Sequence, residues 1–282
     1  MNAAFPKVSV IIPTYNRAHV IRRALHSVLR QTYENLEVIV VDDASTDNTV
    51  DVVASIHDER IVFLQQKNRR GAAVARNIGI QAATGDFVAF QDSDDEWLSE
   101  KIEKQMAMML SANVSIGLVY TGFLRFENKT ATYFPSKNVK MKSGRILGSL
   151  LIGNFVTTQS VVVRKDCLTQ VGLFDEQLPR LQDWELFIRL AGLYEFTCID
   201  EPLLIVFHTP QSITSDNTLF PIALKILLEK HEKQFLSYPI VLAKHYLMLS
   251  LLTFKTAYFV NAVRYLLRSM RASCTVVPPV KR

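Results

Sequence analysis

The 282-residue chain lacks the glycine-rich loops with which many enzymes hold a nucleotide. Its 10 glycines never occur two positions apart, and none opens a GxxxxGK[ST] run, so no glycine backbone is available to cradle a phosphate. Dinucleotide-binding and P-loop functions are therefore excluded. Any phosphate bound here must be neutralised in another way.

Cysteine is scarce, and long apolar runs are missing. The three cysteines are widely spaced and odd in number, which fits neither a disulfide framework nor a CxxC metal site. No stretch reaches the roughly 18 uninterrupted apolar residues of a membrane span. The nearest, residues 246–254, ends at Lys255, and the first ten residues show no signal peptide. We therefore expect a cytoplasmic protein without a spanning helix.

Acidic residues are absent from the last 50 positions, which hold eight Lys and Arg. Residues 1–232 carry 24 basic against 27 acidic side chains, a net charge of −3, so the tail alone gives the chain its overall charge of +5. An overall positive charge suggests a nucleic-acid partner, but the confinement of that charge to the tail argues against one. A basic tail instead indicates an anionic partner surface.

Strand-like and helix-like segments alternate along the first 100 residues. Buried strands are predicted at 8–12, 36–41, 61–64 and 87–90, with helices near 18–30, 47–56 and 71–83 between them. This alternation predicts right-handed βαβ units and a largely parallel sheet. From about residue 116 the rhythm changes, and the expected elements are strands at 117–126 and 160–163, a helix at 181–191, a short strand pair within 196–207, and helices over 222–236 and 240–270.

Acidic residues gather where these strands end. In parallel sheets ligands bind beyond the carboxyl ends of the strands, so carboxylates from two strands should converge on one crevice. Asp42 is expected to be a structural acid satisfied by neighbouring backbone. Asp92 and Asp94, one residue apart after a buried strand, can offer oxygen ligands to Mg²⁺ or Mn²⁺ that bridges to a substrate phosphate. The same turn can also merely cap the following helix.

Four sequence blocks then carry a resemblance: VSVIIPTYNR (8–17), VDDASTDNT (41–49), GAAVARNIG (71–79) and FQDSDDEW (90–97). In this order and spacing they resemble the nucleotide-binding half of a family 2 glycosyltransferase, an inverting enzyme of the GT-A fold. GLFD (172–175) and LQDWEL (181–186) are looser matches in the second half. The resemblance implies an α/β GT-A domain over 1–217, with a mostly parallel central sheet flanked by helices. Its nucleotide-binding half would be 1–100 and its acceptor half 101–217, with residues 218–282 as a basic amphipathic helical tail.

The resemblance also implies roles for the residues at the strand ends. Asp43 would accept from the uracil N–H, Asp92 would lie by the ribose, and Arg76 would lie near the nucleotide, where a guanidinium suits phosphate. The substrate-binding set that it implies is Pro13, Thr14, Tyr15, Asp43, Arg76 and Asp92.

A metal site and a catalytic base complete these implied roles. Asp94 would hold Mn²⁺ or Mg²⁺ on the diphosphate, and Asp183 would take the proton of the acceptor hydroxyl, although Gln182 stands where the family often has Glu. Capping of a helix at 184–190 is the alternative role of Asp183. His208 resembles the family's histidine motif and would complete the metal site. The Tyr-Arg pair expected before it is replaced by residues 205–206 (IV), and a lone His beside an apolar strand is more often structural.

Residues 233–282 of the tail combine aliphatic and aromatic residues with basic charges alone. Within residues 240–271, Arg264, Arg268 and Arg271 share one helix face by i, i+4, i+7 spacing. This composition is typical of an interfacial helix on an anionic membrane surface. A helix packed on the catalytic domain, with solvated cations, is the alternative.

Together these observations predict a metal-dependent inverting glycosyltransferase. It would move a sugar from a nucleotide-diphosphate sugar, a UDP-sugar foremost, to a glycan or lipid-linked acceptor in cell-surface polysaccharide biosynthesis. It would act as a peripheral protein on the cytoplasmic face of the membrane. One alternative is a polyprenyl-phosphate glycosyltransferase, and another is a non-catalytic relative that binds nucleotide sugar or polysaccharide. No nucleic-acid partner is expected, because the crevice is acidic.

Overall fold

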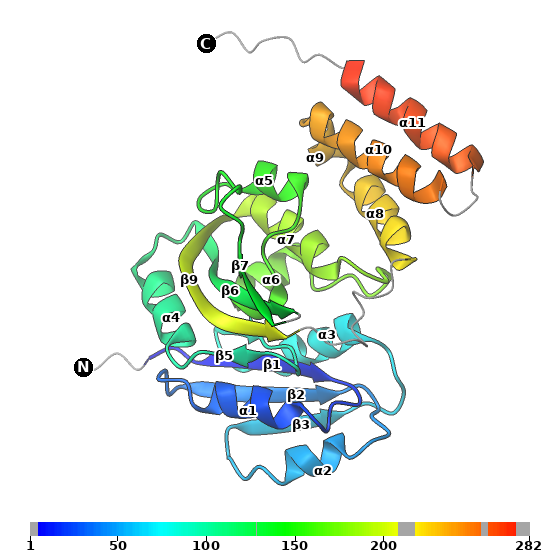
Figure 1. Ribbon diagram of the computed structural model, residues 1–282. Coiled ribbons are helices and arrows are strands. Elements are labelled where there is room, and N and C mark those ends of the chain that lie inside the picture. Colours follow the sequence, from blue (N-terminus) through cyan, green and yellow to red (C-terminus); the bar gives the residue numbers. More distant parts are fainter. Residues whose placement is uncertain (1–4, 128, 208–217, 255–258, 275–282) are drawn as a thin grey trace. The chain divides into compact units, whose positions relative to one another are not determined.

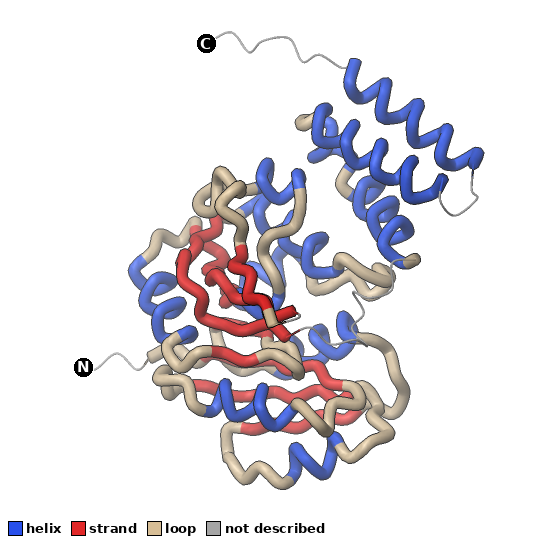
Figure 2. Tube along the Cα trace, in the orientation of Figure 1, coloured by secondary structure: helices blue, strands red, loops and turns tan. Residues whose placement is uncertain are grey.

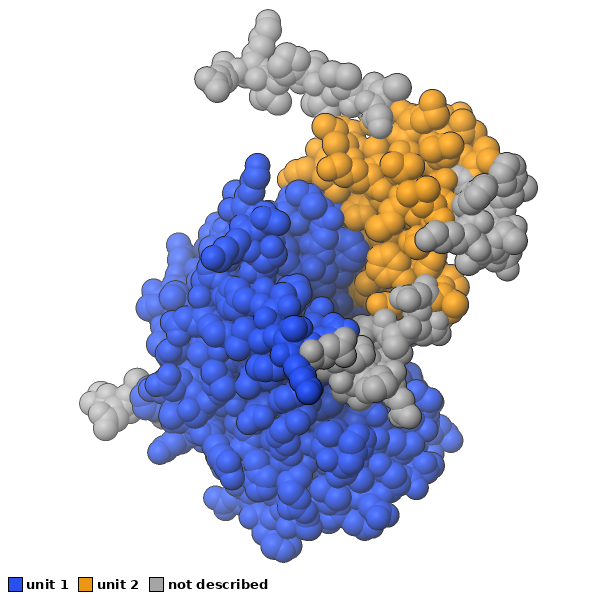
Figure 3. Space-filling view, in the orientation of Figure 1, with its two compact units in different colours: residues 1–176, 182–210 blue, residues 177–181, 211–282 orange. Residues whose placement is uncertain are grey.

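The computed structural model describes residues 5–127, 129–207, 218–254 and 259–274. The chain divides into two compact units (Figure 3). Unit 1 comprises Met1–Glu176 and Gln182–Pro210, and unit 2 comprises Gln177–Leu181 and Gln211–Arg282. Within the described residues, unit 1 is an α/β structure, whereas the elements of unit 2 are helices (Figure 2).

The first part of unit 1 is the predicted parallel sheet (Figure 1). Four parallel strands lie in the order β3-β2-β1-β4. They are β1 (Val8–Thr14), β2 (Leu36–Asp42), β3 (Ile61–Gln65) and β4 (Phe87–Phe90), connected through α1 (Ile21–Leu29), α2 (Thr49–Ala54) and α3 (Ala72–Ala82). All four predicted strands are confirmed, and their carboxyl ends meet at one edge as the alternation requires.

The second part of unit 1 continues the same sheet, whose full order is β3-β2-β1-β4-β8-β6-β9-β5, with β7 paired to β6. Its strands are β5 (Glu96–Trp97), β6 (Ile116–Glu127), β7 (Thr130–Phe134), β8 (Val161–Arg164) and β9 (Glu195–Phe207). Strand β8 is antiparallel to both β4 and β6. The helices are α4 (Lys101–Ser111), α5 (Leu147–Ile152), α6 (Lys165–Val171) and α7 (Gln182–Leu193).

Strand β9 corrects one prediction. The expected short strand pair within 196–207 is a single strand of 13 residues, parallel to β6. Residues such as Asp200, Glu201 and Pro202 commonly interrupt strands. The structure instead shifts the register between Thr121 and Gly122 of β6, and this irregularity accommodates the proline without ending the strand.

Both faces of the sheet are buried, as expected for parallel strands covered by helices. Along β1, Ile11 belongs to one apolar cluster, while Val10 and Ile12 belong to the other. Helix α3 lies very close to the first face, because a Cβ added at Gly79 would come 2.4 Å from Cγ2 of Ile11. Only glycine at position 79 allows this spacing, which fixes how far Arg76, one turn earlier, stands from the strand ends.

Unit 2 contains α8 (Leu219–Lys230), α9 (Glu232–Leu236), α10 (Pro239–Phe254) and α11 (Phe259–Cys274). The segment 240–270, predicted to be helical, contains two helices, α10 and α11. They pack on each other: the rings of Tyr246 and Tyr265 stack at 6.3 Å, and the Ser269 hydroxyl donates to the Ala243 carbonyl at 2.8 Å. Folding back buries apolar side chains that one long helix would expose. None of the described helices is long and apolar enough to cross a membrane.

Candidate active site

The ends of β1 and β2 form one wall of the candidate site. Pro13 and Thr14 are buried in β1, and the Thr14 carbonyl accepts the N–H of Asp43 at 2.8 Å. Tyr15 follows directly, and the Arg69 guanidinium lies 4.1 Å from the centre of its ring. Three of the predicted substrate-binding residues therefore lie together with Asp43 at the strand ends.

Asp42 and Asp43 differ in their contacts, although both are buried. The Asp42 carboxylate accepts the N–H of Ser45 at 3.0 Å and its hydroxyl, which confirms Asp42 as a structural acid. Asp43 instead accepts the backbone N–H groups of Arg70 and Gly71, both at 2.7 Å, and the Gln66 side-chain amide at 2.9 Å. Asp43 thus fixes the loop between β3 and α3 against the end of β2.

The backbone conformation at position 71 favours glycine. Its φ of +95° is a conformation that other residues rarely adopt, and it turns the chain into α3 while its N–H points at Asp43. A carboxylate offers about four acceptor positions, and the loop fills three at Asp43. About one position is left for a ligand.

Arg76 and Asp92 connect helix α3 to the end of β4. A nitrogen of the guanidinium lies 2.8 Å from Oδ1 of Asp92, and the Arg76 side chain is only 10% exposed. The guanidinium also lies 5.6 Å from the ring centre of Phe174. Asp92 thus holds the Arg76 guanidinium in a fixed position after the end of β4.

The acidic turn after β4 concentrates negative charge. Asp95 is buried, and its carboxylate accepts the backbone N–H of Phe207 at 3.1 Å. Burial, together with the charges of Asp92 and Asp94, raises the pKa of Asp95 well above its ordinary value. The field at this turn therefore disfavours further negative charge and favours a cation.

Asp94 lies at the partly exposed side of this turn. Its Oδ2 is 3.9 Å from Nε of Arg17, and its backbone carbonyl accepts from the Arg23 guanidinium. Oxygen donors in a negative field suit a hard divalent cation that keeps open positions for phosphate. Among the described residues no group of three His, Cys, Asp or Glu side chains could enclose a metal ion. The Asp94 carboxylate can offer oxygen ligands to such a cation, and its predicted metal role stays a prediction.

Asp183 lies in the first turn of α7, which begins at Gln182. Its carboxylate accepts the Trp184 N–H at 2.8 Å and the Asn154 side-chain amide at 2.9 Å. Withdrawal from water raises its pKa; the charge of Arg76 opposes this rise, and that of Asp92 adds to it. Asp183 therefore lies within electrostatic reach of the Arg76–Asp92 pair, with a pKa shifted toward that of a better proton acceptor.

His208 lies outside the described residues, so its predicted metal role stays a prediction. Sequence reasoning missed three residues that contact the site: Arg17, Arg23 and Asn154. Arg17 stands in the first of the four blocks, and its place directly after a strand end was a usable signal. Asn154 lies in a segment without a recognisable motif.

Comparisons with known proteins identify the fold and the family. The fold is the GT-A fold of nucleotide-diphospho-sugar transferases, as two solved structures show. The TarS structure of S. aureus in complex with UDP-GlcNAc matches with a TM-score of 0.67 and 18% identity, over 95% of this chain and 92% of that one. The mannosyltransferase PcManGT from Pyrobaculum calidifontis, in complex with GDP-Man and Mn²⁺, matches with a TM-score of 0.62 and 22% identity, over 98% and 78%. The predicted fold class is confirmed.

The sequence comparisons identify the family. Residues 9–168 match the model of glycosyl transferase family 2, and the chain belongs to this family. The chain is 48% identical over 108 residues to the Escherichia coli protein WfgD, named UDP-Glc:alpha-D-GlcNAc-diphosphoundecaprenol beta-1,3-glucosyltransferase. That alignment covers 38% of this chain and 43% of WfgD, less than half of either protein.

Proposed function

We propose that the protein is a metal-dependent inverting glycosyltransferase that uses a UDP-sugar and a lipid-linked or glycan acceptor of cell-surface polysaccharide biosynthesis. Residues 1–217 would carry the catalytic domain and 218–282 the basic tail. The observation that carries the proposal is the influence of the charges of Arg76 and Asp92 on the pKa of Asp183, since it supports a general-base candidate within electrostatic reach of the proposed donor-binding residues. The relative WfgD, whose name gives a UDP-sugar donor and a lipid-diphosphate acceptor, supports both substrate classes.

The hydrogen bonds of Asp43 support uracil as the base of the donor nucleotide. The loop N–H groups and Gln66 fill three of its roughly four acceptor positions. The position that is left matches the single N–H of uracil, whereas guanine presents two neighbouring donors on its corresponding edge. Pro13, Thr14 and Tyr15 would line the base pocket, and Asp92 would lie by the ribose.

The reaction is a displacement at the anomeric carbon. The acceptor hydroxyl oxygen bonds to that carbon as the bond to the UDP oxygen breaks, and Asp183 takes the hydroxyl proton from the face opposite the leaving group. Asn154 donates to the Asp183 carboxylate and would orient it, and Arg76 would lie near the departing diphosphate. Asp94, with His208 as a further candidate ligand, would hold Mn²⁺ or Mg²⁺, which supplies neutralisation of the diphosphate charge when bound.

Unit 2 supports a peripheral position on an anionic membrane. Helix α10 exposes Ile240, Leu247 and Leu251, spaced 7 and 4 residues apart on one face, with Lys244 between them. Helix α11 exposes an apolar stripe at i, i+3, i+4, i+7, and its arginines occupy a neighbouring face. The stripe consists of Val263, Leu266, Leu267 and Met270, and the arginines are Arg264, Arg268 and Arg271. Apolar side chains flanked only by cations match the boundary of anionic lipid.

Substitution of the proposed base tests the catalytic proposal. We expect Asp183→Asn to keep UDP binding in Mn²⁺, because the amide preserves the shape of the side chain, and to lose about 10²- to 10⁴-fold in kcat. Binding is measured by calorimetry, and turnover is measured on donors first selected by thermal shift. Normal turnover by this variant would exclude Asp183 as the base, and a chain that binds no nucleotide sugar would contradict the proposed function itself.

A further inference from the structure

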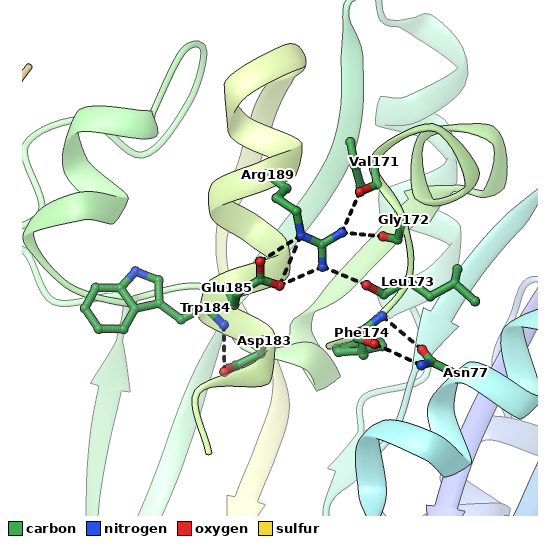
Figure 4. A network of polar contacts seen from close by, with 9 residues as sticks. All are labelled: Asn77, Val171, Gly172, Leu173, Phe174, Asp183, Trp184, Glu185 and Arg189. Carbon is green, nitrogen blue, oxygen red and sulfur yellow. Dashed lines mark hydrogen bonds and ion pairs between the residues drawn. The ribbon is translucent and has the colours of Figure 1, made fainter. Parts of the chain in front are cut away.

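The Arg189 guanidinium lies at the centre of a polar network beside the proposed base (Figure 4). Its Nε and one terminal nitrogen donate to the Glu185 carboxylate one helical turn earlier in α7, at 2.7–3.1 Å. The remaining N–H groups donate to three consecutive backbone carbonyls at 2.6–2.7 Å, those of Val171, Gly172 and Leu173. These bonds engage all five donors of the guanidinium.

The segment that Arg189 holds is also held from its other side. The Asn77 side chain accepts the N–H of Phe174 and donates to its carbonyl, both at 2.9 Å. Asn77 directly follows Arg76 in α3, and the Phe174 ring packs edge-on against Phe90 at the end of β4. Residues 171–174 therefore connect the helix that carries Arg76 to the helix that carries Asp183.

Burial makes this connection rigid. Glu185 is fully buried and Asn77 is 5% exposed, so neither can exchange its partner for water without cost. Gly172 (φ +87°) allows the chain to pass Arg189 closely, since a Cβ there would come 3.3 Å from a terminal nitrogen of the guanidinium. The order along the network is Asp92, Arg76, Asn77, residues 171–174, Arg189, Glu185 and Asp183, so every link joins the donor side of the site to the base.

We propose that Arg189, with Glu185 and Asn77, is a positioning residue that sets the distance between the proposed base Asp183 and the Arg76–Asp92 pair. The inference rests on the proposed function, because it assigns the network a role in that reaction. Arg189 touches no substrate. It fixes the first turn of α7 against the segment that α3 also binds, and a shift of about 1 Å between base and donor is enough to cost about 100-fold in rate.

The test separates turnover from binding. Arg189→Lys keeps a positive charge near Glu185 but cannot reach three carbonyls and a carboxylate with its three donors. We expect kcat to fall about tenfold or more, while the donor KM and the Kd for UDP in Mn²⁺ change less than twofold. The matched control is Arg60→Lys: Arg60 also donates to a carboxylate and a carbonyl, those of Asp58 and Leu29, but at the opposite end of the strands. It should leave kcat unchanged.

Two further variants keep the inference falsifiable if Arg189→Lys folds poorly. Glu185→Leu/Arg189→Leu replaces the buried ion pair by apolar volume, which commonly preserves stability, yet it loses all three carbonyl bonds. We expect a folded protein with normal UDP affinity and low kcat. Asn77→Ala should show the same split between kcat and KM. Recovery of wild-type kcat in the Leu/Leu variant, or a fall in kcat matched by an equal rise in KM, would overturn the positioning role.

The parallel measurement of Asp183→Asn distinguishes the two proposals. If Asp183→Asn turns over normally, the assignment of the base fails whatever Arg189 does. If Asp183→Asn is inactive and Arg189→Lys has normal kcat, only the positioning inference fails.

Discussion

The two units of the chain differ in the partners and the exposure of their charged side chains. In unit 1 the carboxylates of the candidate site have fixed partners: Asp43 has backbone N–H groups, Asp92 has Arg76, and Asp183 has Asn154. In unit 2 the described helices after residue 232 carry exposed cations and no acid. A charge that is partly buried and held by partners can act on one defined atom of a substrate. Exposed charges suit attraction to a partner surface, for which only the total charge matters. The two units should therefore fail independently when either is changed.

Among the changes that compare the two units, the largest effect is expected from Asp94→Asn in unit 1. Loss of this carboxylate should remove the difference in UDP-sugar binding between Mn²⁺ and EDTA and lower kcat by about 100-fold, since a bound cation contributes several kcal/mol to stabilising the leaving group. Calorimetry with and without Mn²⁺ measures the first effect. The control is Asp86→Asn, which changes an exposed acid directly before Phe87, at the other end of β4. An unchanged metal dependence in Asp94→Asn would remove Asp94 from the metal site.

A second prediction concerns unit 2 alone. Arg264→Gln/Arg271→Gln should weaken binding to vesicles that contain phosphatidylglycerol by about 30-fold, because each of the two cations contributes about 1 kcal/mol. Turnover on a short water-soluble acceptor should not change. Flotation measures binding, with phosphatidylcholine vesicles as the uncharged reference and Lys137→Gln/Lys140→Gln, two exposed cations of unit 1, as the matched variant. Equal flotation of both double variants would remove these arginines from the membrane surface.

A smaller effect is expected in the pH dependence of turnover. Asp183 must be ionised to accept a proton, and its pKa is raised, so kcat should fall on acidification at a pH above the ordinary Asp value of about 3.9. Arg76 and Asn154 lower this pKa, whereas Asp92 raises it. Asn154→Ala should therefore move the acidic limb of kcat upward by less than about one pH unit. A downward shift would contradict the role of Asn154.

The smallest expected effect concerns a buried charged residue of unit 1 that, unlike the carboxylates above, has no oppositely charged partner among the described residues. Lys101 is fully buried, donates to Gln105 and lies 3.9 Å from the Trp97 ring centre, and no carboxylate of the described residues pairs with it. Burial lowers its pKa, so between that pKa and the ordinary value near 10.4 the unfolded chain binds an extra proton, and stability should rise with pH. Lys101→Met should abolish this rise and increase Tm at neutral pH by roughly 2–4 °C. A lower Tm would indicate that the ammonium contacts are net stabilising.

The parallel half of unit 1 could be predicted from the sequence because its signals are local. Apolar runs, strand ends and helix spacing place Asp43, Asp92 and Asp94 at one edge of the sheet without any knowledge of tertiary contacts. Strand β9 could not be predicted in the same way. A register shift in its neighbour β6, rather than the local sequence, decides that the chain continues through Pro202.

The network around Asp183 was not predictable for a related reason. Glu185 and Arg189 look like an ordinary i, i+4 pair, and only the tertiary structure shows the three carbonyls that the guanidinium also binds. Asn154 was missed because its segment has no periodic pattern. In unit 2 the arginine spacing was visible in the sequence, but the division into α10 and α11 depends on the pairing of their apolar faces.

The close contact of Gly79 with Ile11 has a genetic consequence. A single added methyl group would lift α3 from the sheet and carry Arg76 away from Asp92 without touching any residue of the site. Such a defect lies in a helix–sheet distance, which heat loosens further and cooling partly restores. Position 79 is therefore a place to obtain conditional alleles, in which the activity of the protein is set by growth temperature rather than by loss of the gene.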